Sequence, residues 1–497
     1  MIAYTEATLP EIDAVMKRSA DAFRQYQETS VAQKALFLET IAAEIEALGD
    51  ALINSANEET NIPAARLLGE RMRTTNQLRM FAQMLKEGSW LELSIDTAIP
   101  TRTPIPKPDM RKMMVPIGPI IVFGASNFPF AYSTAGGDTA SALAAGCSVV
   151  VKAHPAHAQT SEMVAGAIQK AIAQCNMPAD IFQHVHGNTP ASGKALVQHP
   201  ATAGVGFTGS LAGGRALYDY AAERETPIPI FSEMGSVNPV VFLPDTLSVN
   251  AESLSKLYAG SITLGMGQFC TNPGLMLAVE SEGLNKFLQG LGEEIEKVVP
   301  AKMLHTGIHA SYNKKMNEAL QQKGVELVKH STATAGDLEA WPTVATVSGK
   351  TFLSNPLLHE EVFGPYSLMV KCTDMNELQQ VWRSLKGQLS TTLMGTDKDL
   401  TANKELIATA QNIAGRIVFN GVPTGVEVCP SVVHGGPYPA TTDNRFTAVG
   451  IHAVKRWVRP VCYQNCPDSL LPEALQNANP TSAWRLVNNE WTKEAIK

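Results

Sequence analysis

Cysteine is scarce in this chain, with seven residues scattered over 497 positions. An odd, scattered set of this kind excludes a disulfide-stapled scaffold and is typical of a reduced, cytoplasmic protein. Only Cys462 and Cys466 lie close together, and no second Cys or His pair gives them the spacing of a zinc site. The sequence therefore predicts no metal centre.

The chain also lacks a large excess of positive or of negative charge. The formal net charge is −7 and no block of like charges is present, which argues against a nucleic-acid partner. The first residues lack the basic start and apolar run of a secretory signal. The longest uncharged stretch, residues 113–132, contains Pro116, Pro119 and Pro129. It predicts a buried strand and a loop rather than a membrane helix, because proline breaks helices.

The chain contains ordinary apolar and charged fractions, 44% and 18%, which suit a globular protein of two to four structural units. Residues 10–90 carry apolar side chains at helical spacing and predict helices. The proline-rich residues 97–119 predict edge strands or a linker. A second α/β region is predicted for residues 235–430, and the tail after Arg459 has an irregular, polar composition.

Short apolar runs alternate with helical segments between residues 117 and 225. The predicted strands are 119–126, 147–155, 181–187 and 203–210, and the predicted helices are 133–146, 160–175, 191–200 and 211–225. This alternation predicts a parallel sheet with helices on both faces, which is the architecture of a doubly wound α/β domain.

Three polar residues in this framework are candidates for chemistry. Cys270 follows a glycine-rich turn, where a thiolate can act as a nucleophile, although a buried structural cysteine is the commoner outcome. Glu233 ends an apparent strand and is either a general base or a solvated carboxylate. Asn127 also follows a strand and either forms a turn or donates to an oxyanion.

Two further features concern a nucleotide. Lys152 ends the strand SVVVK, so it faces the crevice where nucleotides bind or lies on the surface as an ordinary lysine. Residues 204–209 spell GxGxxG between a strand and a helix. No acid follows at the usual spacing, so this is not interpreted as an ordinary Rossmann fingerprint.

The order of these features resembles the aldehyde dehydrogenase superfamily over nearly the whole chain. The segments that carry the resemblance are SNFPF (126–130), GFTGS (206–210), EMGS (233–236), GQFC (267–270) and EEVFGP (360–365). The resemblance implies an α/β fold with a Rossmann-like cofactor domain, an α/β catalytic domain and a small β oligomerisation element. Their expected boundaries are residues 1–92 with 115–234, residues 235–455, and residues 93–114 with 456–497, in a homodimer or homotetramer.

The resemblance also implies roles for matching residues. Cys270 would be the nucleophile, Glu233 the base for hydrolysis, and Asn127, with the Cys270 backbone N–H, the oxyanion hole. The implied cofactor-binding residues are Ser126, Lys152, Gly209, Ser210, Gly214, Glu361 and Phe363, and the implied substrate residue is Phe128. An aldehyde would be oxidised through a cysteine thioester with hydride transfer to NAD(P).

Three positions refine this expectation. Glu233 favours hydrolysis to a free acid over transfer to coenzyme A. Ser236 replaces the second glycine of the superfamily's common E-L-G-G. Pro155 stands three residues after Lys152, where NAD-preferring members often carry a glutamate. Loss of that carboxylate removes repulsion against a 2′-phosphate, so NADP is expected to be preferred to NAD.

Residues 66–90, 123–157 and 434–443 resemble the branch of α-ketoglutaric semialdehyde (2,5-dioxopentanoate) dehydrogenases. The implied product is 2-oxoglutarate, formed at the end of bacterial sugar-acid or hydroxyproline breakdown. An NADP-dependent fatty or broad-range aldehyde dehydrogenase stays open as the alternative. A cofactor-independent thiol esterase and a non-catalytic structural protein of this fold are more remote.

A dicarboxylic semialdehyde needs a cation at the far end of its pocket. The candidates on the predicted helical segment are Arg66, Arg71, Arg73 and Arg79, with Arg73 the first to test. For any one of them, a surface salt bridge or a packing contact is the competing interpretation.

Overall fold

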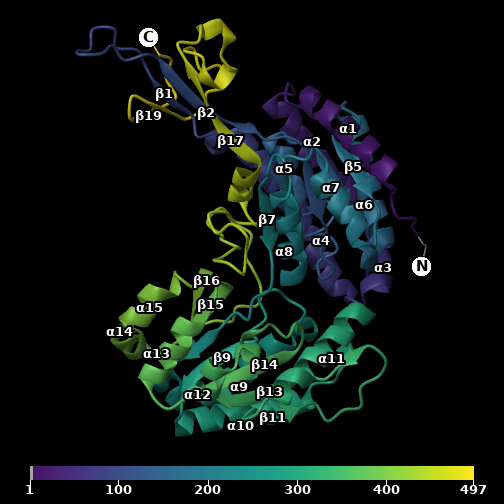
Figure 1. The fold of residues 1–497 in the computed structure, drawn as a ribbon, viewed down its shortest axis with the longest axis vertical. Helices are drawn as coiled ribbons and strands as arrows, with labels where there is room; N and C mark the ends of the chain where they lie inside the picture. Colours follow the sequence, from purple (N-terminus) through teal and green to yellow (C-terminus); the bar gives the residue numbers. More distant parts are fainter. Residues whose placement is uncertain (1–3, 497) are drawn as a thin grey trace.

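The computed structural model describes residues 4–496, in which helices and strands form two layered α/β bodies and a projecting arm (Figure 1). The predicted N-terminal helices are present. They are α1 (Leu9–Tyr26), α2 (Val31–Ala47), α3 (Gly49–Thr60) and α4 (Ala64–Glu87). Thr8 and Ser30 begin the first two with capping boxes, which satisfy backbone amides that the helix leaves unpaired.

The first sheet has five parallel strands in the order β5-β4-β3-β6-β7. These strands are β3 (Ile120–Phe123), β4 (Val149–Lys152), β5 (Phe182–Val185), β6 (Gly204–Thr208) and β7 (Ile230–Glu233). The connecting helices are α5 (Gly137–Ala145), α6 (Ala158–Gln174), α7 (Pro190–Gln198) and α8 (Leu211–Ala222). The predicted alternation of strand and helix is confirmed, and residues 113–132 form strand and loop rather than a membrane helix.

Both faces of this sheet are buried, as expected for parallel strands. One face packs on α2, α4, α5 and α6, and the other on α1, α7 and α8. The register places Phe123 beside Lys152, and Thr208 beside Glu233, at the carboxyl ends of their strands. The GxGxxG glycines Gly204 and Gly206 lie inside β6, so they do not form the phosphate turn of an ordinary Rossmann motif.

The second sheet has the order β11-β13-β14-β9-β8-β15-β16. Its strands are β8 (Val240–Phe242), β9 (Leu275–Val279), β11 (Glu326–His330), β13 (Thr343–Ser348), β14 (Tyr366–Cys372), β15 (Gln388–Met394) and β16 (Ala414–Phe419). Helices α9 (Pro244–Thr263) and α10 (Glu282–Lys297) cover one face. The remaining helices are α11 (Thr306–Leu320), α12 (Gly349–Ser354), α13 (Met375–Ser384), α14 (Asp397–Ala402) and α15 (Lys404–Ala410).

Short elements complete the chain. The 3-10 helices are η1 (Ser89–Leu91), η2 (Pro155–His157), η3 (Leu264–Gly267), η4 (Pro356–His359), η5 (Ile451–Trp457), η6 (Asp468–Leu470) and η7 (Glu473–Leu475). Strands β10 (Ala301–Lys302) and β12 (Glu339–Ala340) form a two-stranded ladder.

A third sheet projects from the body as an arm that carries the C-terminal segment (Figure 1). Its order is β17-β2-β1-β18-β19, built from β1 (Ser94–Asp96), β2 (Met110–Pro116), β17 (Val458–Gln464), β18 (Arg485–Val487) and β19 (Glu490–Thr492). These strands agree with the small β element that the resemblance implied, whereas the irregular tail expected from composition alone is wrong for β17, β18 and β19. Arg459, Gln464 and Glu490 of β17 and β19 are exposed, whereas Arg485 of β18 is buried, and backbone pairing with β2 and β1 stabilises the strands.

Candidate active site

An open cavity of about 1200 Å³ lies at the carboxyl ends of the first-sheet strands. Its walls come from the loops after β3, β6 and β7, from Cys270, from α11 and from the 361–363 segment. Eight of the predicted site residues line it, namely Ser126, Asn127, Gly209, Ser210, Glu233, Cys270, Glu361 and Phe363. Segments more than 200 residues apart in sequence thus meet at one place, which is the usual location of a ligand site in an α/β protein.

The turn before Cys270 is tightly constrained. Gly265, Met266 and Gly267 all have positive φ angles of 55–61°, a region that disfavours ordinary side chains. A Cβ on Gly267 would lie 2.2 Å from the carbonyl oxygen of Gly364, so only glycine fits. The turn holds Cys270 partly buried at the cavity wall, where desolvation first and the nearby Glu233 carboxylate second raise the pKa of the thiol well above its usual value.

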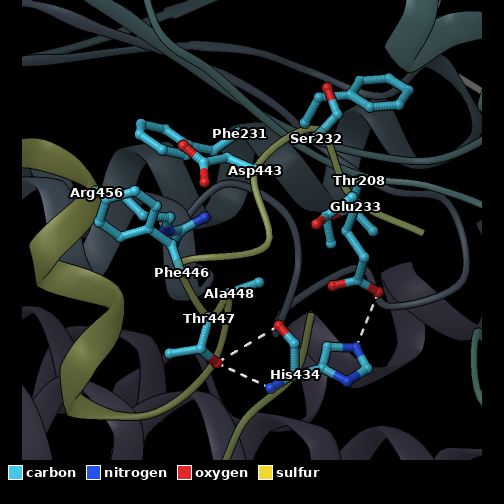
Figure 2. A pocket seen from close by; sticks show the side chains of 12 residues that line it. Thr208, Phe231, Ser232, Glu233, His434, Asp443, Phe446, Thr447, Ala448 and Arg456 are labelled. Carbon is cyan, nitrogen blue, oxygen red and sulfur yellow. Dashed lines mark hydrogen bonds and ion pairs between the residues drawn. The ribbon is translucent and has the colours of Figure 1, made fainter. Parts of the chain in front are cut away.

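Glu233 and Cys270 meet at one nitrogen of the His434 ring. Oε1 of Glu233 lies 2.9 Å from Nε2 of His434, and the same Nε2 lies 3.5 Å from Sγ of Cys270. The side chains of Glu233 and His434 are both buried, and Figure 2 shows the carboxylate and the ring facing one another. The backbone N–H of His434 donates to Oγ1 of Thr447 at 2.9 Å, which fixes the ring's position. Such a Cys–His–carboxylate arrangement can move a proton off a thiol.

Asn127 follows β3 and is buried. Its Nδ2 donates to the carbonyl of Gln268 at 3.2 Å, two residues before Cys270. Its own carbonyl accepts from Nη2 of Arg66 at 2.7 Å. The amide therefore lies against the thiol-bearing turn, in a position suited to an oxyanion donor.

The other end of the cavity suits a dinucleotide. Ser210 begins α8 by accepting from the N–H of Gly213 at 3.2 Å, so a helix N-terminus with free amides faces the cavity. Such termini bind phosphate. The backbone carbonyl of Glu361 accepts from Nζ of Lys315 at 3.0 Å, which holds this residue in place. Burial raises the pKa of its side-chain carboxyl group to about 7. These residues fit a nicotinamide dinucleotide.

Four predicted residues lie outside the cavity lining. Lys152 ends β4 and is partly buried, and burial lowers the pKa of its amine. Gly214 lies in α8 against the strand layer, where a Cβ would meet Sδ of Met234 at 2.6 Å. Phe128 and Arg73 belong to an aromatic and basic region next to the thiol, with the guanidinium 5.7 Å from the Phe128 ring.

Comparison with known proteins agrees with this geometry. Residues 1–437 match the aldehyde dehydrogenase family. The chain belongs to the aldehyde dehydrogenase family. This aldehyde dehydrogenase is 46% identical over 480 residues to alpha-ketoglutaric semialdehyde dehydrogenase 2 of Azospirillum brasilense, covering 97% of this chain and 91% of the relative. It is 44% identical over 491 residues to alpha-ketoglutaric semialdehyde dehydrogenase of Acinetobacter baylyi, covering 99% and 93%.

The fold agrees with solved structures of the family. Glyceraldehyde-3-phosphate dehydrogenase GapN from Methanocaldococcus jannaschii, complexed with NADP, superposes with a TM-score of 0.78 at 17% identity. The superposition covers 93% of this chain and 96% of that one. The predicted α/β fold and the predicted aldehyde dehydrogenase activity are confirmed, and the cofactor of the family is NAD(P).

Sequence reasoning missed His434. The segment 434–443 contributed to the resemblance, but no role was inferred for its first residue. The contact with Cys270 joins residues 164 positions apart through a segment without regular secondary structure. The sequence signal for His434 was its place at the start of HGGPYPATTD (434–443), one of the segments that carry the resemblance.

Two groups within residues 4–496 bring metal-ligating atoms together, and one of them is Glu233, Cys270 and His434 itself. The other consists of Glu162, His184 and His186, in which Oε1 of Glu162 lies 3.2 Å from Nδ1 of His184 and 2.5 Å from Nε2 of His186. The absence of a metal from the reaction stays a prediction.

Proposed function

We propose that this aldehyde dehydrogenase oxidises 2,5-dioxopentanoate (α-ketoglutaric semialdehyde) to 2-oxoglutarate, with NADP preferred to NAD. The observation that carries the chemistry is the convergence of Cys270, His434 and Glu233 within hydrogen-bond reach beside a dinucleotide-sized cavity. The substrate is supported by relatives of that name, which match over nearly their full length.

In the proposed mechanism, the proton of the Cys270 thiol moves to Nε2 of His434, and the imidazolium lies next to the Glu233 carboxylate. The thiolate adds to the aldehyde carbon, while Nδ2 of Asn127 and the Cys270 backbone N–H hold the oxyanion. One such donor is worth about 10²–10³ in rate. When bound, NAD(P) supplies the hydride acceptor. Glu233 then removes a proton from the water that hydrolyses the thioester, which releases the acid and the thiol.

The cofactor preference rests on the end of β4. Pro155 is exposed at the first position of η2, three residues after Lys152. The charge that most affects the amine of Lys152 belongs to Glu6, whose carboxylate accepts from Thr189 instead. Because Pro155 has no charge, a 2′-phosphate beside Lys152 would meet no carboxylate at that position.

The two large sheets are proposed to have different roles. We propose that the first sheet with the N-terminal helices binds the cofactor and that the second sheet supports catalysis. The arm is proposed to join subunits into a homodimer or homotetramer, because its sheet has the open edge strands β17 and β19 and it exposes the apolar side chains of Ile105, Trp484 and Trp491. The seven cysteines, all free, support a reducing, cytoplasmic setting.

A substrate panel tests this function. Initial rates of nicotinamide reduction are measured with 2,5-dioxopentanoate, pentanal and hexadecanal, each with NAD and with NADP. We expect kcat/KM to be highest for 2,5-dioxopentanoate with NADP, by about tenfold or more over each competitor. Preference for hexadecanal would favour a fatty aldehyde dehydrogenase, and preference for NAD would overturn the cofactor proposal.

Removal of the imidazole tests the proton path. In His434→Asn, the thiol loses the acceptor 3.5 Å away while burial continues to raise its pKa. We expect the rate at which iodoacetamide alkylates Cys270 at pH 7 to fall roughly tenfold, and its pH profile to move to higher pH. Exposed Cys462 is the internal control in the same mass spectra. An unchanged profile for Cys270 would remove His434 from the activation of the nucleophile.

A further inference from the structure

Glu70 is a buried carboxylate to which the proposed mechanism gives no role. It lies on α4 and is 5% exposed, although moving a carboxylate out of water is costly. Its Oε1 accepts from the backbone N–H of Phe130 at 2.8 Å and from that of Ala131 at 3.0 Å. The side chain is therefore bound to the backbone of the loop that follows β3.

This loop, residues 124–136, has neither helix nor strand. Phe130 and Ala131 are buried in it, at 1% and 3% exposure, so their N–H groups are shielded from bulk solvent. An irregular buried backbone needs hydrogen-bond partners from elsewhere, because an unpaired buried N–H is costly. Glu70 supplies one acceptor atom to two of these groups, which fixes this part of the loop against α4.

Asn127, the proposed oxyanion donor, belongs to the same loop. Its backbone carbonyl accepts from Nη2 of Arg66 at 2.7 Å. Arg66 precedes Glu70 by four residues, so the two side chains lie on the same face of α4. The loop also closes on itself, because the N–H of Ala125 donates to the carbonyl of Tyr132 at 2.8 Å. Helix α4 therefore holds the backbone of this closed loop at two places, one of them at Asn127 itself.

The side chain of Asn127 projects from this held backbone toward the thiol-bearing turn. Its Nδ2 donates to the carbonyl of Gln268, two residues before Cys270. A catalytic donor must be held within about 0.5 Å of its productive position. A shift of the loop would move Nδ2 by a similar amount, so the contacts that fix the loop also fix the donor.

Two other charged residues of α4 have different contacts. Nη1 of Arg71 donates to the carbonyl of Gly49 at 2.8 Å. Arg79 binds both carboxylate oxygens of Glu46 at 2.7 Å. These contacts hold α4 against α3 and α2, so Arg71 and Arg79 form the packing contact and the surface salt bridge that competed with a substrate role.

We propose that Glu70 is a positioning residue for the oxyanion step, because its contacts with Phe130 and Ala131 hold the loop from which Asn127 donates. The inference rests on the proposed role of Asn127. Glu70 is not among the residues that line the cavity, so it acts through the loop rather than on the aldehyde or the cofactor. Both of its partners are N–H groups, so the role requires an acceptor oxygen at this position rather than a negative charge.

The first test compares Glu70→Met, Glu70→Gln and Arg71→Met, with kcat and the KM for NADP measured with 2,5-dioxopentanoate and with pentanal. In Glu70→Met, we expect kcat to fall about 30-fold with both aldehydes, while the KM for NADP stays within about twofold. Glu70→Gln should retain kcat within about threefold, because its side-chain carbonyl can still accept from both N–H groups. Arg71→Met removes a contact with a different backbone segment and is the matched control, which should keep the wild-type kcat.

A double-mutant cycle separates positioning from general damage. Asn127→Ala alone should lower kcat by about 10²–10³-fold. Adding Glu70→Met to Asn127→Ala should lower it by less than about twofold more, because the donor that Glu70 positions is already absent. If Glu70→Met does not fold, Glu70→Asp takes its place. The aspartate keeps the charge but is one methylene group too short to reach both N–H groups, so the same non-additivity is expected.

The results distinguish the two proposals. A wild-type kcat in Asn127→Ala would refute the proposed role of Asn127. A loss in Asn127→Ala that multiplies with the loss in Glu70→Met would leave Asn127 in place and overturn the positioning role of Glu70. The same conclusion follows if Glu70→Met keeps the wild-type kcat, if Glu70→Gln loses as much as Glu70→Met, or if the loss is confined to 2,5-dioxopentanoate.

Discussion

Replacing Cys270 by alanine is expected to lower the rate of NADPH formation by at least about 10⁴-fold, since residues that act as one catalytic unit fail together when the nucleophile is lost. Glu233, His434 and Asn127 remain in the variant, but no carbon–sulfur bond can form. The measurement is the initial rate with 2,5-dioxopentanoate at saturating NADP, together with intact-protein mass.

The matched control is Cys462→Ala, which removes an exposed thiol on β17, far along the chain from the cavity. It should keep full activity. Residual turnover of more than about one per cent in Cys270→Ala would mean that another group carries the acyl chain, and the thioester mechanism would have to be abandoned.

Replacing Glu233 by glutamine is expected to separate oxidation from hydrolysis. The amide keeps the shape of the side chain beside His434, but it cannot deprotonate water. Steady-state kcat should fall by about 10²–10³-fold, while the first turnover persists as a burst of one NADPH per active site. The burst is followed by stopped-flow absorbance, and the trapped acyl-enzyme by its added mass on Cys270.

The pH dependence of this variant has a defined sign. Burial and then the Glu233 carboxylate raise the pKa of Cys270, so removal of the carboxylate lowers that pKa, and alkylation at pH 8 should become faster. Glu252→Gln, at an exposed position of α9, is the control for loss of one charge. A slow variant with no burst and no bound acyl group would place Glu233 outside the hydrolytic step.

The first sheet could be predicted because its signals are local. Apolar runs of four or five residues end in a glycine or a polar residue, and the intervening helices have their own periodicity. Cys270, Glu233 and Asn127 could be found because each sits in a short motif, and the order of the motifs along the chain is itself informative.

The position of His434 and the pairing of the tail strands depend on contacts between distant segments, which no local sequence pattern contains. His434 meets the thiol because an irregular segment folds back beside β7, with Met234 N–H donating to the carbonyl of Ala440. The tail strands were implied by the resemblance, whereas the polar composition of the tail alone did not indicate them, because β17 has mostly exposed positions and is stabilised by its ladder with β2.

The close packing of Gly267 against the Gly364 carbonyl couples the position of Cys270 to that of the 361–364 segment. Asn272 adds a hydrogen bond from its Nδ2 to the same carbonyl at 3.1 Å. The segment that ends in Gly364 also carries Glu361 and Phe363, which line the cofactor end of the cavity. Neither segment can move without displacing the other, so the spacing between Cys270 and the cavity wall formed by Glu361 and Phe363 is set by one rigid contact.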